Sequence, residues 1–140
     1  MMNKLLRTSL IALAGTTVLS LAAPLVASAS GAAKATSLYN CSTLTQRPRE
    51  IVLSCADGNT YISKISWSSW SGASAQAKGT LHWNTCTPTC VAGTDKSKVI
   101  TFTATSRRKV KGTWLYTELK DHKNTWNTGS ALYSLPTSPL

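Results

Sequence analysis

The chain has 140 residues, and its 15 Lys and Arg against five Asp and Glu give a formal net charge of +10 at pH 7. This length suits one domain and excludes two, and the positive balance favours solubility and attraction to anionic partners such as nucleic acid, cell-wall polymers or lipid head groups. The charge alone does not choose among these partners.

The N-terminus has the pattern of a secretory signal peptide. Lys4 and Arg7 form a positive head, an apolar run follows over residues 10–26, and the small residues Ala27-Ser28-Ala29 match the form after which signal peptidase cuts. We therefore expect residues 1–29 to be removed and the product to be secreted. The alternative is a retained membrane anchor, but polar residues interrupt the run, no charged cluster follows it, and no second long apolar segment exists.

The remaining sequence is even in composition and predicts one β domain over residues 41–134, expected to be a monomer. Residues 30–40 are predicted to be a flexible leader because they begin with small and polar residues, and residues 33–35 offer a second cleavage site. Two prolines in residues 135–140 predict a fraying tail.

Apolar and polar residues alternate with period two, which predicts β-strands. An apolar run at 51–55 and an alternating segment at 60–67 flank Asp57-Gly58-Asn59, a turn signal in which glycine can take positive φ. We expect a hairpin here. The face predicted to be apolar in its second strand carries Tyr61, Ile65 and Trp67.

Further strands are predicted at 75–84, 98–106 and 113–119, and a sixth around 131–133. Their apolar faces carry Ala77, Leu81 and Trp83, then Ile100, Phe102 and Ala104, and then Trp114 and Tyr116. No sustained helical period is present, and β-branched and aromatic residues dominate. The expected fold is therefore all-β, a small antiparallel sandwich or barrel of five to six short strands stapled by two disulfides.

Four cysteines in an exported chain are typical of a disulfide framework, and three pairings are open. We favour Cys41–Cys55, which would close a loop of about 15 residues that chain-entropy models credit with about 3 kcal/mol. We also favour Cys86–Cys90, which would close the turn Thr87-Pro88-Thr89. A zinc site is the competing interpretation, but no pair has the C-x2-C spacing. We expect neither a metal nor a cofactor.

Three stretches resemble a known family: Cys-Ala-Asp-Gly-Asn at 55–59, Trp-Ser-Ser-Trp at 67–70, and Asn-Thr-Cys-Thr-Pro-Thr-Cys-Val-Ala-Gly at 84–93. The chain is similar over roughly 51–105 to a family of small secreted actinobacterial proteins of unknown function. The resemblance implies an exported β domain with both disulfides, and it carries over no functional residue. Lys78 departs from the family's pattern.

A basic segment outside that pattern is the sharpest functional signal. Six cations lie within sixteen residues: Lys96, Lys98, Arg107, Arg108, Lys109 and Lys111. If the strands at 98–106 and 113–119 pair, the last four cations project from one connecting tip. Such a tip can bind phosphates, and arginine can do so bidentately. The alternative is a solvated loop whose charges protect a sheet edge from aggregation.

Five tryptophans pose a similar choice. Trp67, Trp83 and Trp114 fall on apolar strand faces and are expected to pack in the core. Trp70 and Trp126 lie in irregular segments and are the candidates for stacking on sugar rings or bases.

Catalytic candidates are few. His82 with Glu118 is the one acid–base pair that we consider, for RNA cleavage, and Asp57 is explained by its turn. No nucleophile-elbow, phosphate-loop or zinc-protease motif is present. We therefore predict a non-enzymatic binding module for an anionic polymer of the cell wall, or for nucleic acid. The alternatives are an inhibitor or interaction protein that presents the Cys86–Cys90 loop, and a small secreted nuclease or hydrolase.

Overall fold

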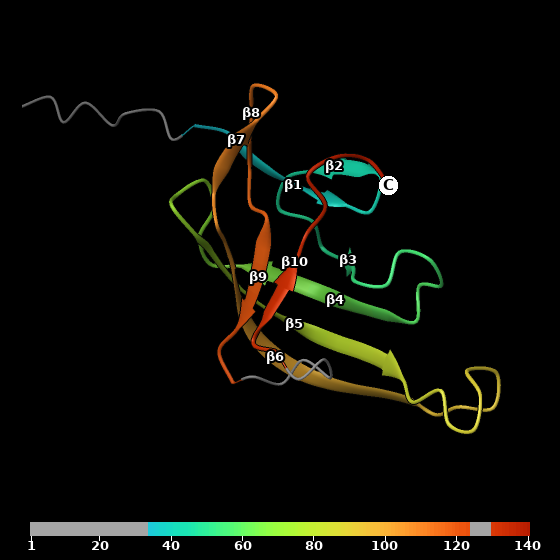
Figure 1. The fold of residues 1–140 in the computed structure, drawn as a ribbon. Helices are drawn as coiled ribbons and strands as arrows, with labels where there is room; N and C mark the ends of the chain where they lie inside the picture. Colours follow the sequence, from blue (N-terminus) through green and yellow to red (C-terminus); the bar gives the residue numbers. More distant parts are fainter. Residues whose placement is uncertain (1–33, 124–129) are drawn as a thin grey trace, which may run out of the picture.

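The computed structural model describes residues 34–123 and 130–140, which form two sheets and contain no helix (Figure 1). The predicted all-β fold is confirmed. The strands of the described ranges are β1 (Thr36–Asn40), β2 (Thr43–Thr45), β3 (Ile51–Val52), β4 (Thr60–Trp67), β5 (Ala75–Asn84), β6 (Asp95–Thr105), β7 (Arg108–Val110), β8 (Thr113–Leu115), β9 (Glu118–Asp121) and β10 (Leu132–Ser134).

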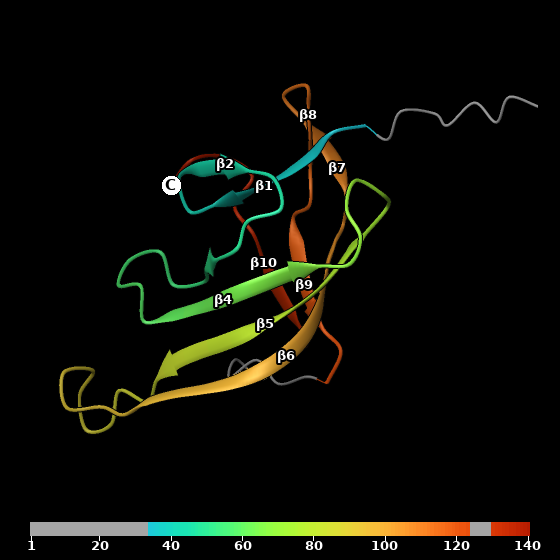
Figure 2. The ribbon, with the colours of Figure 1, turned by 180° about the vertical axis from the view of Figure 1, so that it is seen from behind.

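The larger sheet has the order β10-β9-β6-β5-β4-β3 and is antiparallel throughout. Seen from behind, β4, β5 and β6 sweep across the molecule as a curved sheet (Figure 2). The expected alternation holds on β5 from Ala75 to Leu81 and on β6 from Ile100 to Ala104, where every second residue faces the core. The buried set is Ala75, Ala77 and Leu81 on β5, and Ile100, Phe102 and Ala104 on β6.

The smaller sheet has the order β2-β1-β8-β7. Its β1–β8 pair is parallel, with Thr36 opposite Trp114, and its two other pairs are antiparallel. The predicted flexible leader at 30–40 is therefore wrong for its second half, because β1 pairs on both sides and Leu38 is fully buried. Residues 30–33 and the predicted signal peptide lie outside the described residues.

The predicted fraying tail is wrong for its first residue. Leu135 is buried, and its N–H donates to the Thr117 carbonyl at 2.8 Å. The core therefore extends one residue past the boundary predicted at 134.

A β-bulge changes the faces of β4. The register shifts between Ser63 and Ser66, and Lys64 takes a φ of 52°. Ile62 before the bulge and Ile65 after it both face the core, so Tyr61 lies on the outer face. The prediction that Tyr61 shares a face with Ile65 is wrong because one extra residue reverses the alternation.

The strand predicted at 113–119 is two strands, because the chain passes here from one sheet to the other. Three consecutive residues, Leu115, Tyr116 and Thr117, are buried, which no single strand with one exposed face allows. The Tyr116 hydroxyl donates to the Gly72 carbonyl at 3.0 Å, and burial raises the pKa of this phenol.

Both predicted disulfides are present, Cys41–Cys55 and Cys86–Cys90. The first joins the turn after β1 to the hairpin between β3 and β4, where the Asn59 N–H donates to Asp57 Oδ1 as expected for a turn aspartate. In the described ranges, no helix is long and apolar enough to cross a membrane.

Candidate anion-binding surfaces

The basic segment forms a β-hairpin, β7–β8, that projects from one end of the molecule (top of Figure 1). Lys111 and Gly112 make its turn with φ values of 45° and 87°, the positive φ that a type I′ hairpin turn requires at both positions. Arg108, Lys109 and Lys111 are exposed. Structure thus brings together three of the four cations predicted at this tip.

Arg107 is the fourth predicted cation, and it faces the protein. Its guanidinium carbon lies 4.4 Å from the centre of the Trp114 ring. Its Nε donates to Thr36 Oγ1 at 2.9 Å, and its Nη2 donates to the Lys34 carbonyl at 3.3 Å. These contacts fasten the hairpin to β1, and the binding of a ligand by Arg107 stays a prediction.

Trp70 also makes contacts within the fold. Its Nε1 donates to the Thr36 carbonyl at 2.9 Å, and its ring packs edge-on against Trp67 and Tyr116, with centroids 4.5 and 5.3 Å away. Its ring is partly buried against the core, and its stacking on a ligand stays a prediction. Trp126 lies outside the described residues.

A second basic surface was not predicted. Arg47 and Arg49 lie beside the β4 bulge and, with Lys64, line a shallow hollow of about 540 Å³ whose other walls are Ile65, Ser66 and Trp67. We call these six residues the basic hollow. The signals in the sequence are the tripeptide Arg-Pro-Arg at 47–49 and a single lysine inside an apolar strand. Neither shows that the two segments meet.

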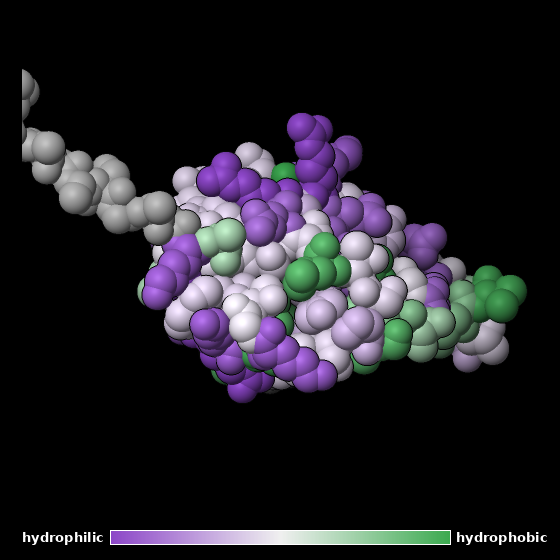
Figure 3. All heavy atoms as spheres, turned by 90° about the horizontal axis from the view of Figure 1, so that it is seen from above, coloured by the Kyte–Doolittle hydropathy of each residue, from purple (hydrophilic) through white to green (hydrophobic). Residues whose placement is uncertain are grey.

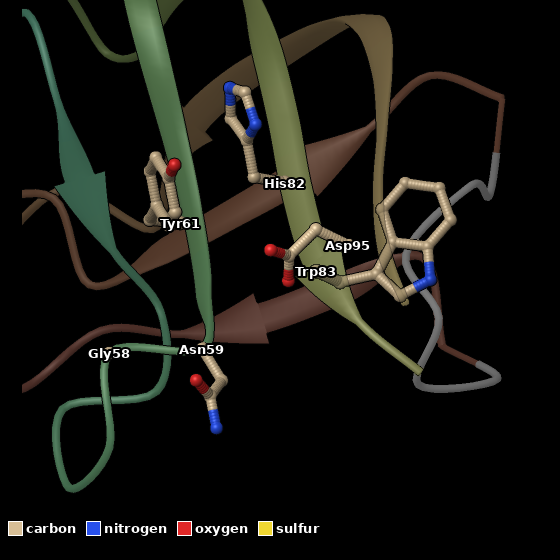
Figure 4. Close-up of a pocket in the computed structure, with 6 residues that line it drawn as sticks. All are labelled: Gly58, Asn59, Tyr61, His82, Trp83 and Asp95. Carbon is tan, nitrogen blue, oxygen red and sulfur yellow. The ribbon is translucent and has the colours of Figure 1, made fainter. Parts of the chain in front are cut away.

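A second hollow, of about 440 Å³, lies at the start of β4 and the end of β5, and its lining includes Gly58, Asn59 and Asp95 (Figure 4). The Tyr61 and His82 rings stack at 4.5 Å and within 8° of parallel, and His82 Nε2 lies 2.8 Å from Ser63 Oγ. Asp95 accepts a hydrogen bond from Asn84, and within the described residues no carboxylate bonds to His82. The Ser63–His82 contact therefore lacks the acid that orients the base in a catalytic triad.

The His82–Glu118 pair is separated by the register of β6. His82 is opposite Ser97 near the start of β6, and Glu118 is opposite Thr105 at its end. At about 3.3 Å per residue, these positions lie about 26 Å apart along the strand. The two side chains cannot share a substrate proton. Residues 34–123 and 130–140 also hold no group of three or more potential metal ligands among His, Cys, Asp and Glu.

The loop between β5 and β6 is a rigid projection on the far side from the hairpin (lower right of Figure 1). The Cys86–Cys90 disulfide closes it, and Asn84 Oδ1 accepts from the Cys86 N–H at 2.7 Å. Two hydrogen bonds join the two arms of the loop. The Thr85 N–H donates to the Thr94 carbonyl at 3.0 Å, and the Thr94 N–H donates to the Thr85 hydroxyl at 3.0 Å. Val91 at the tip is 100% exposed. The space-filling view shows hydrophobic residues gathered at this end (right of Figure 3).

No protein family, no curated protein and no solved structure matches this chain. The resemblance to small secreted actinobacterial proteins therefore stays a prediction.

Proposed function

We propose that this protein is an exported, non-enzymatic binding module that attaches to an anionic polymer of the cell envelope or its surroundings through the β7–β8 hairpin. The observation that carries the proposal is the exposure of Arg108, Lys109 and Lys111 on one hairpin that contains no acidic residue. The two disulfides are compatible with an oxidising, extracellular compartment.

The hairpin suits this role because its backbone is ordered before binding. The β7–β8 pairing fixes the strands, and the contacts of Arg107 with Trp114 and Thr36 fix the hairpin to β1. Little backbone conformational entropy is then lost when the cations meet a row of anionic groups. Each anionic group that a cation neutralises on a polyanion releases condensed counterions, which makes binding sensitive to salt.

The test is co-sedimentation of the purified, oxidised protein, without residues 1–29, with isolated cell envelope over a salt series. We expect retention at low salt and a linear fall of log K with log salt concentration. With three cations engaged, the slope is expected to be about −2 to −3, from roughly −0.7 to −0.9 per neutralised phosphate on nucleic acids. Retention that does not change with salt, or no retention at any salt, would contradict the proposal.

A second candidate function rests on the Cys86–Cys90 loop. A fully exposed valine on a loop held by a disulfide and hydrogen bonds offers a preordered apolar tip, which lowers the cost of docking into a groove of another protein. The loop and the hairpin lie on opposite sides of the molecule, so the two functions are separable.

Val91→Asp tests this candidate. If the loop docks on a partner protein, the variant is expected to bind that partner at least about tenfold more weakly in a salt-resistant 1:1 complex, because a charge replaces a desolvated apolar anchor. Size-exclusion chromatography of the complex in high salt measures the loss. Val99→Asp on β6 is the matched control, since Val99 is 63% exposed and lies outside the loop. Equal behaviour of the two variants would exclude the loop.

A further inference from the structure

We propose that the basic hollow is a binding site for a phosphate group carried on a sugar or polyol, separate from the β7–β8 hairpin. The hollow brings three cations from two segments of the chain around one depression: Arg47 and Arg49 from the segment after β2, and Lys64 from β4. All three side chains are exposed.

The backbone holds two of these cations in an unfavourable conformation. Arg47 has a φ of 46° and Lys64 a φ of 52°, in the left-handed region that glycine or asparagine adopts at lower cost. Left-handed residues that are neither glycine nor asparagine are uncommon, and they cluster at functional sites. The chain thus uses two cations around one hollow where a smaller residue would fit the backbone better.

The bulge at Lys64 determines to which face of the sheet its side chain points. A regular β4 would place Lys64 on the core face with Ile62, because alternate residues share a face. The extra residue between Ser63 and Ser66 turns Lys64 out to solvent and returns Ile65 to the core. Bulges commonly re-aim a side chain in this way beside binding sites.

Two hydrogen bonds fix the arginines against the bulge. The Ile65 N–H donates to the Arg49 carbonyl at 2.9 Å, and Trp67 Nε1 donates to the Pro48 carbonyl at 2.8 Å. Pro48 is itself buried between its two exposed neighbours. The backbone of the segment that carries the two arginines is therefore fixed beside the bulge before any ligand arrives.

The lining selects the class of ligand. Among the residues that the structure describes, no acidic residue lines the hollow, and the side chains of Arg47, Arg49 and Lys64 make no hydrogen bond or ion pair. Lys78 adds a fourth exposed cation directly opposite Ser66 on β5. Arginine forks match phosphate oxygens in pairs, which makes phosphate a better fit than a small halide.

The size and the remaining walls indicate that the phosphate is attached to a larger polar body. A volume of about 540 Å³ lies in the range of small-molecule sites and exceeds what a lone phosphate fills. Ser66 and the half-buried Trp67 in the lining suit a sugar or polyol, which combines hydroxyls with apolar C–H groups.

Lys64→Asn gives a test that separates binding from structure. Asparagine tolerates the left-handed backbone better than lysine, so the variant is expected to unfold at a higher urea midpoint than the wild type. It is also expected to bind glucose 6-phosphate about tenfold more weakly or worse, from the loss of a charge-assisted hydrogen bond. Arg47→Asn is expected to show the same two changes. Calorimetric titration of the oxidised protein measures the affinity, with inorganic phosphate and glucose as the two partial ligands.

Two control variants separate the effect on stability from the effect on binding. Ser71→Gly relieves a φ of 66° outside the hollow, so it should raise the urea midpoint and leave the affinity unchanged. Lys96→Gln removes one exposed charge outside the hollow and should change the affinity less than about twofold, since exposed charges beyond a Debye length are screened.

Absence of saturable binding of glucose 6-phosphate to the wild type would overturn the inference, as would unchanged affinity in both asparagine variants. Glucose binding as tight as glucose 6-phosphate would also overturn it, because the cations would then have no role. The inference does not rest on the proposed function: loss of envelope retention tests the hairpin, and loss of sugar-phosphate binding tests the hollow.

Discussion

Replacing Arg108, Lys109 and Lys111 together by glutamate is expected to weaken binding to an anionic polymer by at least about 10²-fold at low salt. A cation close to an anionic surface contributes about 1 kcal/mol, so loss of three contributes roughly 3 kcal/mol, and the introduced negative charges add repulsion. The salt dependence of the residual binding should also flatten. Envelope co-sedimentation of wild type and variant over the same salt series measures both effects.

The matched control reverses three other exposed lysines, Lys96, Lys120 and Lys123, and so makes the same change in net charge. If the hairpin is the site, this control should lose much less affinity than the hairpin variant. Equal losses would show that the whole positive surface attracts the polymer without a defined site. Survival of binding in the hairpin variant would exclude the hairpin. Arg107 is left intact in both variants because its contacts with Trp114 and Thr36 stabilise the fold.

The sequence predicted the elements whose local pattern matches their final surroundings. Strand β5 was expected at 75–84 and runs over that range, because its alternation is unbroken and one face is buried along its length. The bulge in β4 was missed because β4 itself contains neither glycine nor proline, and the glycine that packs against the bulge, Gly79, lies on β5. The change of sheet at Tyr116 was missed because the pairing of distant segments creates it, and no local signal precedes it.

The second half of the predicted leader was expected to be flexible because residues 30–40 begin with small and polar residues. Its order comes from the pairing of β1 with β2 and β8, and Trp70 Nε1 adds a hydrogen bond to the Thr36 carbonyl in the same segment. These contacts join segments that are far apart in the sequence, so no local pattern predicts them.

The two candidate sites also differ in whether a local sequence pattern predicts them. The hairpin was predicted because its cations are neighbours in sequence. The basic hollow was not, because Arg49 and Lys64 are brought together only by the backbone hydrogen bond from Ile65 to Arg49. Sites assembled by such long-range contacts leave little trace in a single sequence.

Phe102→Ala is expected to lower the free energy of unfolding by about 3–5 kcal/mol, a cost typical of removing a buried aromatic ring. Phe102 is 0% exposed on β6, and its ring meets Trp67 edge-on with centroids 5.6 Å apart. The free energy of unfolding of a small domain is about 5–15 kcal/mol in total, so this loss removes much of its stability. Urea denaturation of the oxidised protein, followed by tryptophan fluorescence, measures it.

The neighbouring residue supplies the control. Thr101→Ala on the exposed face of the same strand is expected to change stability by less than about 0.5 kcal/mol. Phe102→Leu keeps most of the volume and should cost less than Phe102→Ala, since shape as well as area is then partly conserved. Because Trp67 rests on Phe102 and also lines the basic hollow, a folded Phe102→Leu protein should bind glucose 6-phosphate more weakly than Thr101→Ala does. Equal stability of Phe102→Ala and wild type would show that this ring does not support the core, and the placement of Trp67 would then need another explanation.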